Sequence, residues 1–140
     1  MKRSFLLLSI LLPLSFILSS CSTSGMFTSL NTTNVDLREA NYKIVATNVS
    51  GTSEAGYLFG FTLPNGPLTN TLALFRVSGS GLLYQEALSD LWKNYESANG
   101  SVAGKRLALV NVRYDTDALN ALFLYTSAKV NIRADVVEFE

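Results

Sequence analysis

Histidine is absent from this chain of 140 residues, and cysteine occurs only once, as Cys21. The lack of histidine excludes the Ser-His-Asp and Cys-His arrangements of nucleophilic catalysis, which need an imidazole base. Zinc and copper sites of the usual His/Cys kind are excluded as well. Catalysis by carboxylates, lysine or tyrosine has no supporting spacing in the sequence. We therefore expect a protein that is not an enzyme and that holds no metal and no cofactor.

Neither sign of charge is in excess, with 11 Lys and Arg side chains against 11 Asp and Glu. Two of the cations are Lys2 and Arg3, so the side chains of residues 21–140 have a net charge of −2. A chain without a basic patch is not expected to bind nucleic acid. About 120 residues are enough for one domain with its own core, and too few for two.

The long apolar run of the sequence lies at residues 5–18, directly after the two N-terminal cations. It is shorter than the about 20 apolar residues that a transmembrane helix needs, and Pro13 interrupts it. Small residues follow the run. A positive start, an apolar stretch and small residues at a cleavage point are typical of a secretory signal, which we assign to residues 1–20.

The end of this signal, Leu18-Ser19-Ser20-Cys21, resembles the lipobox of bacterial lipoproteins. In that family the cysteine thiol receives a diacylglyceryl group, the chain is cut before the cysteine, and the new amine is acylated with a fatty acid such as palmitate. The resemblance implies that Cys21 is the lipidated first residue of the mature protein. Lipidation also explains a lone thiol in an exported chain. The alternative is an ordinary secretory signal without lipidation, because Ser20 and Ser22 are small enough to flank the cut.

The residues after Cys21 bear on the location of the protein. Ser22 stands where many lipoproteins that stay in the inner membrane have Asp, so the resemblance implies the outer membrane of the bacterial cell envelope. No acidic cluster follows, which favours the periplasmic side. Residues 21–35 are rich in Ser, Thr and Asn and are interpreted as a lipidated tether, followed by a single domain at 36–140.

The domain begins with strand patterns. Residues 42–49 are rich in β-branched and aromatic side chains, 50–53 have turn chemistry, and aromatic residues alternate over 55–61. We interpret this stretch as a hairpin. Residues 63–67 predict a further turn, and 72–77 fit either a short strand or a helical turn.

The second half of the domain predicts one helix and two more strands. Apolar residues at helical spacing predict an amphipathic helix at about 81–98, with Ser80 as its N-cap and Gly100 as its stop. Residues 106–114 predict a central strand, 115–120 a connection, and 122–125 the start of a last strand that alternates over 129–136. The expected fold class is α+β, an antiparallel sheet of four to five strands with the helix on one face.

Two surfaces for interaction follow from these patterns. The last strand has no proline to protect it, so we expect it to present a free edge to a second copy or to a strand of an envelope protein. Tyr57, Phe59 and Trp92 are candidates for contact with a ligand or a partner. The alternative for these aromatic residues is an ordinary place in the core.

Three segments, 34–45 (NVDLREANYKIV), 56–60 (GYLFG) and 129–139 (KVNIRADVVEF), together resemble an uncharacterised family of short bacterial lipoproteins. Because that family has no assigned activity, the resemblance implies an architecture and a location and transfers no catalytic residue. The expected function is that of a non-enzymatic, lipid-anchored envelope protein that binds another protein or itself. The alternative is a carrier that binds a small molecule or lipid in the aromatic region between hairpin and helix.

Overall fold

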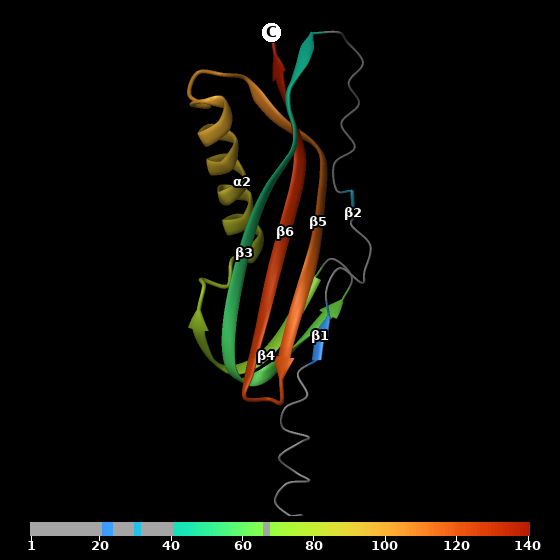
Figure 1. Cartoon of the computed structure of the whole chain (residues 1–140), viewed down its shortest axis with the longest axis vertical. Helices are drawn as coiled ribbons and strands as arrows, with labels where there is room; N and C mark the ends of the chain where they lie inside the picture. The colour runs from blue at the N-terminus through green and yellow to red at the C-terminus, as the bar shows by residue number, and fades with distance from the viewer. Residues whose placement is uncertain (1–20, 24–29, 32–40, 66–67) are drawn as a thin grey trace, which may run out of the picture.

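The computed structural model describes residues 21–23, 30–31, 41–65 and 68–140, and its elements are shown in Figure 1. The elements are β1 (Cys21–Thr23), β2 (Leu30–Asn31), β3 (Tyr42–Asn65), β4 (Leu68–Ser78), α2 (Leu83–Asn99), β5 (Leu107–Ala121) and β6 (Tyr125–Phe139). The strands form one antiparallel sheet in the order β1-β5-β6-β3-β4, and β2 also pairs with β5. An antiparallel sheet with one helix agrees with the predicted α+β class.

Strand β3 is continuous over 24 residues, so the predicted hairpin with a turn at 50–53 is wrong. The reason lies at Gly51, where the backbone of α2 touches the strand. A Cβ atom added to Gly51 would lie 2.2 Å from the carbonyl oxygen of Ala87 and 2.3 Å from the backbone nitrogen of Leu91. Glycine at this position therefore serves a close approach of two backbones and makes no turn.

Helix α2 also bonds to the free edge of β3. The Thr52 backbone N–H donates to the Asp90 carboxylate at 2.9 Å, and the Asn94 side-chain amide donates to the Ser50 carbonyl at 2.9 Å. At this level the other edge of β3 is paired with β6. Two helix side chains thus occupy backbone groups that would otherwise be open to a further strand.

The last strand, β6, is the centre of the sheet. It pairs with β5 on one side and with β3 on the other along almost its whole length. The expectation of a free edge on residues 129–136 is therefore wrong, because β3 extends further along β6 than the sequence indicated. The alternation predicted for 129–136 is confirmed, with Val130, Ile132 and Ala134 buried and Arg133 exposed between them.

Strand β5 also continues further than predicted. Residues 115–120, interpreted as a connection, belong to this strand, and residues 122–124 form the turn to β6. Leu122 and Phe123 have φ values of 46° and 61°, and the Leu124 N–H donates to the Ala121 carbonyl at 3.0 Å. The polar side chains of 115–120 resemble those of a turn, but pairing with β6 keeps them extended.

Helix α2 agrees with the predicted helix in type and end. Its N-cap is Leu82 and not Ser80, whose hydroxyl instead accepts the N–H of Leu82 at 3.1 Å outside the helix. The helix ends before Gly100, whose N–H donates to the Glu96 carbonyl at 2.9 Å. No helix in the part of the chain that the structure describes is long and apolar enough to cross a membrane.

The hydrophobic core lies between α2 and the sheet. Ala87 and Leu91 of the helix share one buried cluster with Val112 of β5 and with Val130, Ile132 and Ala134 of β6. Alanine on both sides allows the backbones to approach closely, as at Gly51. Trp92 and Tyr114 pack partly buried at the margin of this cluster.

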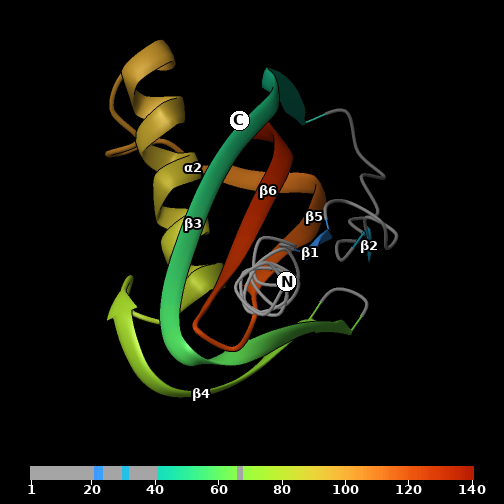
Figure 2. The same cartoon turned by 60° about the horizontal axis from the view of Figure 1, so that its bottom comes forward.

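At its lower end the sheet curls, because β3 changes partner. Its first part pairs with β6 as far as Leu58, while Gly56–Asn65 pairs with β4, which crosses the end of the molecule (Figure 2). The Asn120 side chain fixes the curl: its Oδ1 accepts the Thr62 N–H at 2.7 Å, and its Nδ2 donates to the Thr62 carbonyl at 2.9 Å. The Asn120 amide thus replaces a strand partner for β3.

Two parts of the predicted tether lie against the sheet. Cys21–Thr23 pairs with residues 118–120 of β5, and Leu30–Asn31 pairs with residues 113–114. The predicted signal peptide and the remainder of the 21–35 tether lie outside the described residues. Pairing with β5 holds Cys21 close to the domain.

Candidate functional site

Two bulges interrupt the sheet at the same level, one on each side of β6. The register shifts between Ala46 and Val49 of β3, and between Val110 and Arg113 of β5. Each bulge contains an asparagine with positive φ, 55° at Asn48 and 51° at Asn111. Asparagine tolerates this left-handed conformation better than most residues. Bulges redirect side chains and are frequent beside functional sites.

Asp135 of β6 joins the two bulges. Its Oδ1 accepts the Asn48 backbone N–H at 2.8 Å, and its Oδ2 accepts the Asn111 side-chain amide at 2.9 Å. The bonds from the Asn111 side chain and the Asn48 N–H lower the pKa of Asp135 below its ordinary 3.8; burial opposes them, and the charge of Arg113 adds a weaker lowering. Asp135 is thus ionised at neutral pH, where it is a structural anion and a poor general acid.

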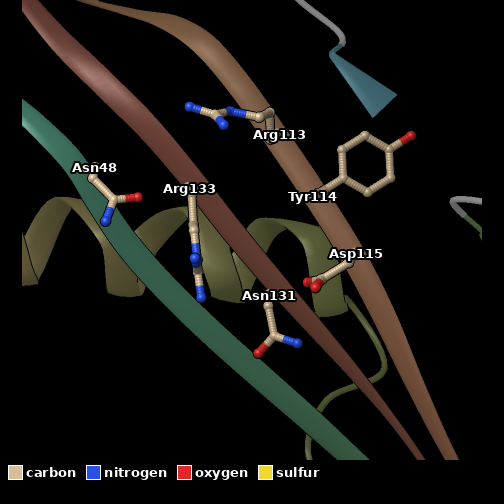
Figure 3. A pocket seen from close by; sticks show the side chains of 6 residues that line it. All are labelled: Asn48, Arg113, Tyr114, Asp115, Asn131 and Arg133. Atoms are coloured by element: carbon tan, nitrogen blue, oxygen red, sulfur yellow. The ribbon is translucent and has the colours of Figure 1, made fainter. Parts of the chain in front are cut away.

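A hollow of about 260 Å³ opens beside these bulges. It is lined by Asn48 of β3, Arg113, Tyr114 and Asp115 of β5, and Asn131 and Arg133 of β6 (Figure 3). The Tyr114 ring points away from the other five side chains and meets Tyr84 of α2, with ring centroids 5.9 Å apart. Helix α2 lies behind the strands in this view, so the hollow opens on the sheet face that α2 does not cover.

Two arginines dominate the charge of the hollow. Arg113 and Arg133 are direct cross-strand partners and both are exposed. Like charges at such a position are unfavourable. Among the described residues neither guanidinium forms an ion pair with a carboxylate, whereas Lys43 and Glu138 do so at 3.0 Å. Two neighbouring guanidinium groups that form no ion pair are suited to bind a carboxylate or phosphate group.

The opposite end of the molecule exposes apolar side chains. Phe59 of β3, Leu72 and Leu74 of β4, and Leu122, Phe123 and Leu124 of the β5–β6 turn are all exposed; we call these six residues the apolar tip. Leu72, Leu74 and Phe123 are 71%, 74% and 66% exposed. Exposed apolar surface of this extent usually marks an interaction site.

Contacts across the curl hold the apolar tip together. The N–H groups of Phe59 and Gly60 donate to the carbonyls of Leu124 and Phe123 at 3.1 and 2.9 Å. The Phe61 and Phe123 rings meet edge to face, with centroids 5.4 Å apart. Below them lies a polar layer, in which the fully buried Thr62 and Thr126 hydroxyls are 2.9 Å apart. The turn and the β3–β4 ribbon therefore form one surface.

Cys21 lies at the border of the apolar tip. It is the first residue of β1 and pairs in register with Asn120, two residues before Leu122. The same Asn120 holds Thr62 through its side chain. The residue predicted to carry lipid is therefore beside the apolar end of the sheet.

The aromatic residues predicted as contacts do not form one site. Phe59 belongs to the apolar tip, where its ring meets that of Phe75 at 6.5 Å. Trp92 lies on α2, packs at the core margin and meets Tyr95 at 5.8 Å. Tyr57 is half-buried on β3, and none of the three lines the hollow of Figure 3.

Sequence reasoning missed the hollow, and of the apolar tip it named only Phe59. A signal for the tip was present, since residues 55–75 and 118–128 contain no charged side chain. Nothing local marks Arg113 and Arg133 as neighbours. Within the described residues, no group of three His, Cys, Asp or Glu side chains could hold a metal ion.

The chain belongs to a family of unknown function, DUF6567, whose model matches residues 1–140. This membership agrees with the predicted uncharacterised family. Neither a curated protein nor a solved structure gives a match.

Proposed function

We propose that this protein is a non-enzymatic lipoprotein of the bacterial cell envelope that is anchored through Cys21 and acts by binding. The expected location is the periplasmic side of the outer membrane. Its partner is an envelope protein or a second copy of the chain. The polar sheet face that α2 leaves uncovered offers the binding surface, and the apolar end carries the anchor.

The position of Cys21 is the observation that carries this proposal. Cys21 pairs with Asn120 beside the exposed apolar turn at residues 122–124. Acyl chains attached to Cys21 would therefore start next to apolar surface of the domain, which supports a lipid anchor at this residue. Burial of acyl chains contributes about 0.8 kcal/mol for each methylene, and two or more chains hold a protein stably on a membrane.

Metabolic labelling with a radioactive fatty acid tests the anchor. The wild-type chain should incorporate label and fractionate with membranes, whereas Cys21→Ser should incorporate none and accumulate as precursor or soluble protein. Ser22→Ala is the matched control, because it changes the next residue and keeps the thiol. Label in Cys21→Ser, or an unlabelled wild type that is released as soluble protein, would disprove the lipid anchor.

A small anionic ligand is a second candidate, favoured by the guanidinium groups of Arg113 and Arg133, which form no ion pair within the part of the chain that the structure describes. This proposal moves the predicted carrier site from the aromatic residues to the hollow of Figure 3. For its test we define the anchor-free chain as residues 21–140 with Cys21→Ser, which contains every described helix and strand.

Calorimetric titration of the anchor-free chain with inorganic phosphate and with succinate tests the second candidate. Binding should weaken at least tenfold in Arg113→Gln and in Arg133→Gln, since each loses a charge-assisted bond of about 1.5–3 kcal/mol. Arg76→Gln is the control, because Arg76 lies on β4 and bonds to the Ser80 carbonyl. If Arg113→Gln and Arg133→Gln bind the ligand as tightly as the Arg76→Gln control, the hollow is excluded as the site.

A further inference from the structure

We infer that the apolar tip is a membrane-contact surface, which lies in the interface of the phospholipid bilayer beside the acylated Cys21. The inference rests on the proposed lipid anchor and adds a second, protein-borne contact with the same membrane. It assigns an orientation to the domain, with the β5–β6 turn and the β3–β4 ribbon towards the lipid.

The composition of the apolar tip is the first support. Residues 55–75 and 118–128, which form the curl and the turn, contain no Asp, Glu, Lys or Arg, although the chain has 22 such residues. Insertion of the tip among acyl chains therefore desolvates no charge. A charged side chain within the apolar layer of a membrane costs about 2.5–3.5 kcal/mol or more.

Backbone hydrogen bonds of β3 and of Leu124 in the turn are the second support. Backbone groups placed in lipid must be bonded internally. At the tip the N–H groups of Phe59, Gly60 and Leu124 all have carbonyl partners, at 2.9 to 3.1 Å. Asn120 supplies hydrogen-bond partners for both the N–H and the carbonyl of Thr62, in the polar layer beneath the apolar side chains.

The place of the anchor is the third support, and it favours a bilayer over a second copy of the chain. The register of β1 puts Cys21 beside Asn120, so acyl chains would start at the edge of the apolar tip. A neighbouring copy would have to share this end of the molecule with those acyl chains. Protein interfaces also contain about one hydrogen bond for each 100–200 Å², whereas the exposed side chains of the tip offer no donor or acceptor.

Vesicle sedimentation of the anchor-free chain tests the tip without any lipid on the protein. The vesicles contain phosphatidylethanolamine with a minor fraction of phosphatidylglycerol, and a second set contains phosphatidylcholine alone. We expect binding to both sets with little dependence on salt, because no charge of the tip takes part. Phe123→Ser with Leu124→Ser should lower the partition coefficient about tenfold for each side chain, since burial of one contributes at least about 1.4 kcal/mol.

Ile44→Ser with Leu82→Ser is the matched control. Both side chains are 60% exposed and apolar, and both lie outside the apolar tip, so partition should stay at the wild-type value. Equal losses in the two double variants would overturn the inference, as would no binding at millimolar lipid. Sedimentation velocity without vesicles tests whether a second copy of the chain occupies the tip instead. A wild-type dimer that becomes a monomer in the Phe123→Ser, Leu124→Ser variant would assign the tip to a second copy.

The outcome is separable from that of the labelling experiment. The anchor-free chain cannot be acylated at position 21, so vesicle binding depends only on the protein surface. Failure of fatty-acid labelling removes the anchor and leaves the vesicle result standing. Failure of vesicle binding removes the membrane contact and leaves the anchor standing.

Discussion

Replacement of Gly51 by alanine is expected to displace helix α2 from the sheet. The added Cβ atom would lie 2.2 Å from the Ala87 carbonyl oxygen and 2.3 Å from the Leu91 nitrogen, whereas ordinary contacts begin at 3.4 Å. Both atoms belong to the helix backbone, so no side chain can rotate away. The helix must retreat by about 1 Å, which weakens the dispersion contacts of the fully buried Leu91.

The expected loss follows from this geometry. Overpacking costs about 1–3 kcal/mol, and we expect the upper end because the retreat also lengthens the bonds from Asp90 and Asn94 to β3. Small proteins have urea m-values of about 1–3 kcal/mol per M, so a loss near 3 kcal/mol lowers the urea midpoint by about 1–3 M. Circular dichroism and the fluorescence of Trp92, the single tryptophan, report the transition in the anchor-free chain.

Gly104→Ala is the matched control for this prediction. It adds the same methyl group where no atom lies within 4 Å, at a φ of +77°. Only backbone strain of about 1–2 kcal/mol applies there, and Trp92 emission should not change. Equal midpoints for the two variants, or an unshifted Trp92 spectrum in folded Gly51→Ala, would refute the close contact between helix and strand.

Two further predictions concern single side chains. The pKa of Asp135 is lower in the folded protein than its ordinary 3.8, so the ionised carboxylate stabilises the fold fully above pH 3.8. This stabilisation disappears as the pH falls through the folded-state pKa. The difference in urea midpoint between wild type and Asp135→Ala should therefore be constant near neutral pH and become smaller in acid. A difference that widens in acid would contradict the two hydrogen bonds. Leu91→Ala should cost about 2–5 kcal/mol, since Leu91 is 0% exposed, and Leu82→Ala, at a 60% exposed position, should cost little. Similar thermal melts for these two variants would place Leu91 outside the core.

The elements that the sequence predicted well are those that local pattern determines. The apolar stripe of α2, with Ala87, Leu91 and Tyr95 buried, is spaced for a helix whatever the rest of the chain does. Gly100 ends that helix through its own positive φ of 81°. The alternation in β6 likewise needs only one covered face.

The errors arose where a distant element decides between two local solutions. Ser50-Gly51-Thr52-Ser53 is suitable for a turn, and its extended form depends on Ala87, Asp90 and Asn94, more than thirty residues later. The bulges at Asn48 and Asn111 are equally non-local, because the carboxylate that joins them comes from β6. The spacing of residues in the sequence does not indicate which of these distant residues contact each other.

The two candidate surfaces both follow from the length of β3. At about 3.3 Å per residue, its 24 residues would span roughly 80 Å if straight, while the 15 residues of β6 span only about 50 Å. The strand therefore extends beyond the end of β6 and pairs there with β4, and this part includes Phe59, whose φ is 54°. Its first half places Asn48 at the hollow, and its second half carries β4 to the apolar tip. Asn48 and Phe59 are eleven positions apart, roughly 35 Å along the strand. If the tip lies on the bilayer, the hollow stands well clear of the lipid headgroups and open to solvent.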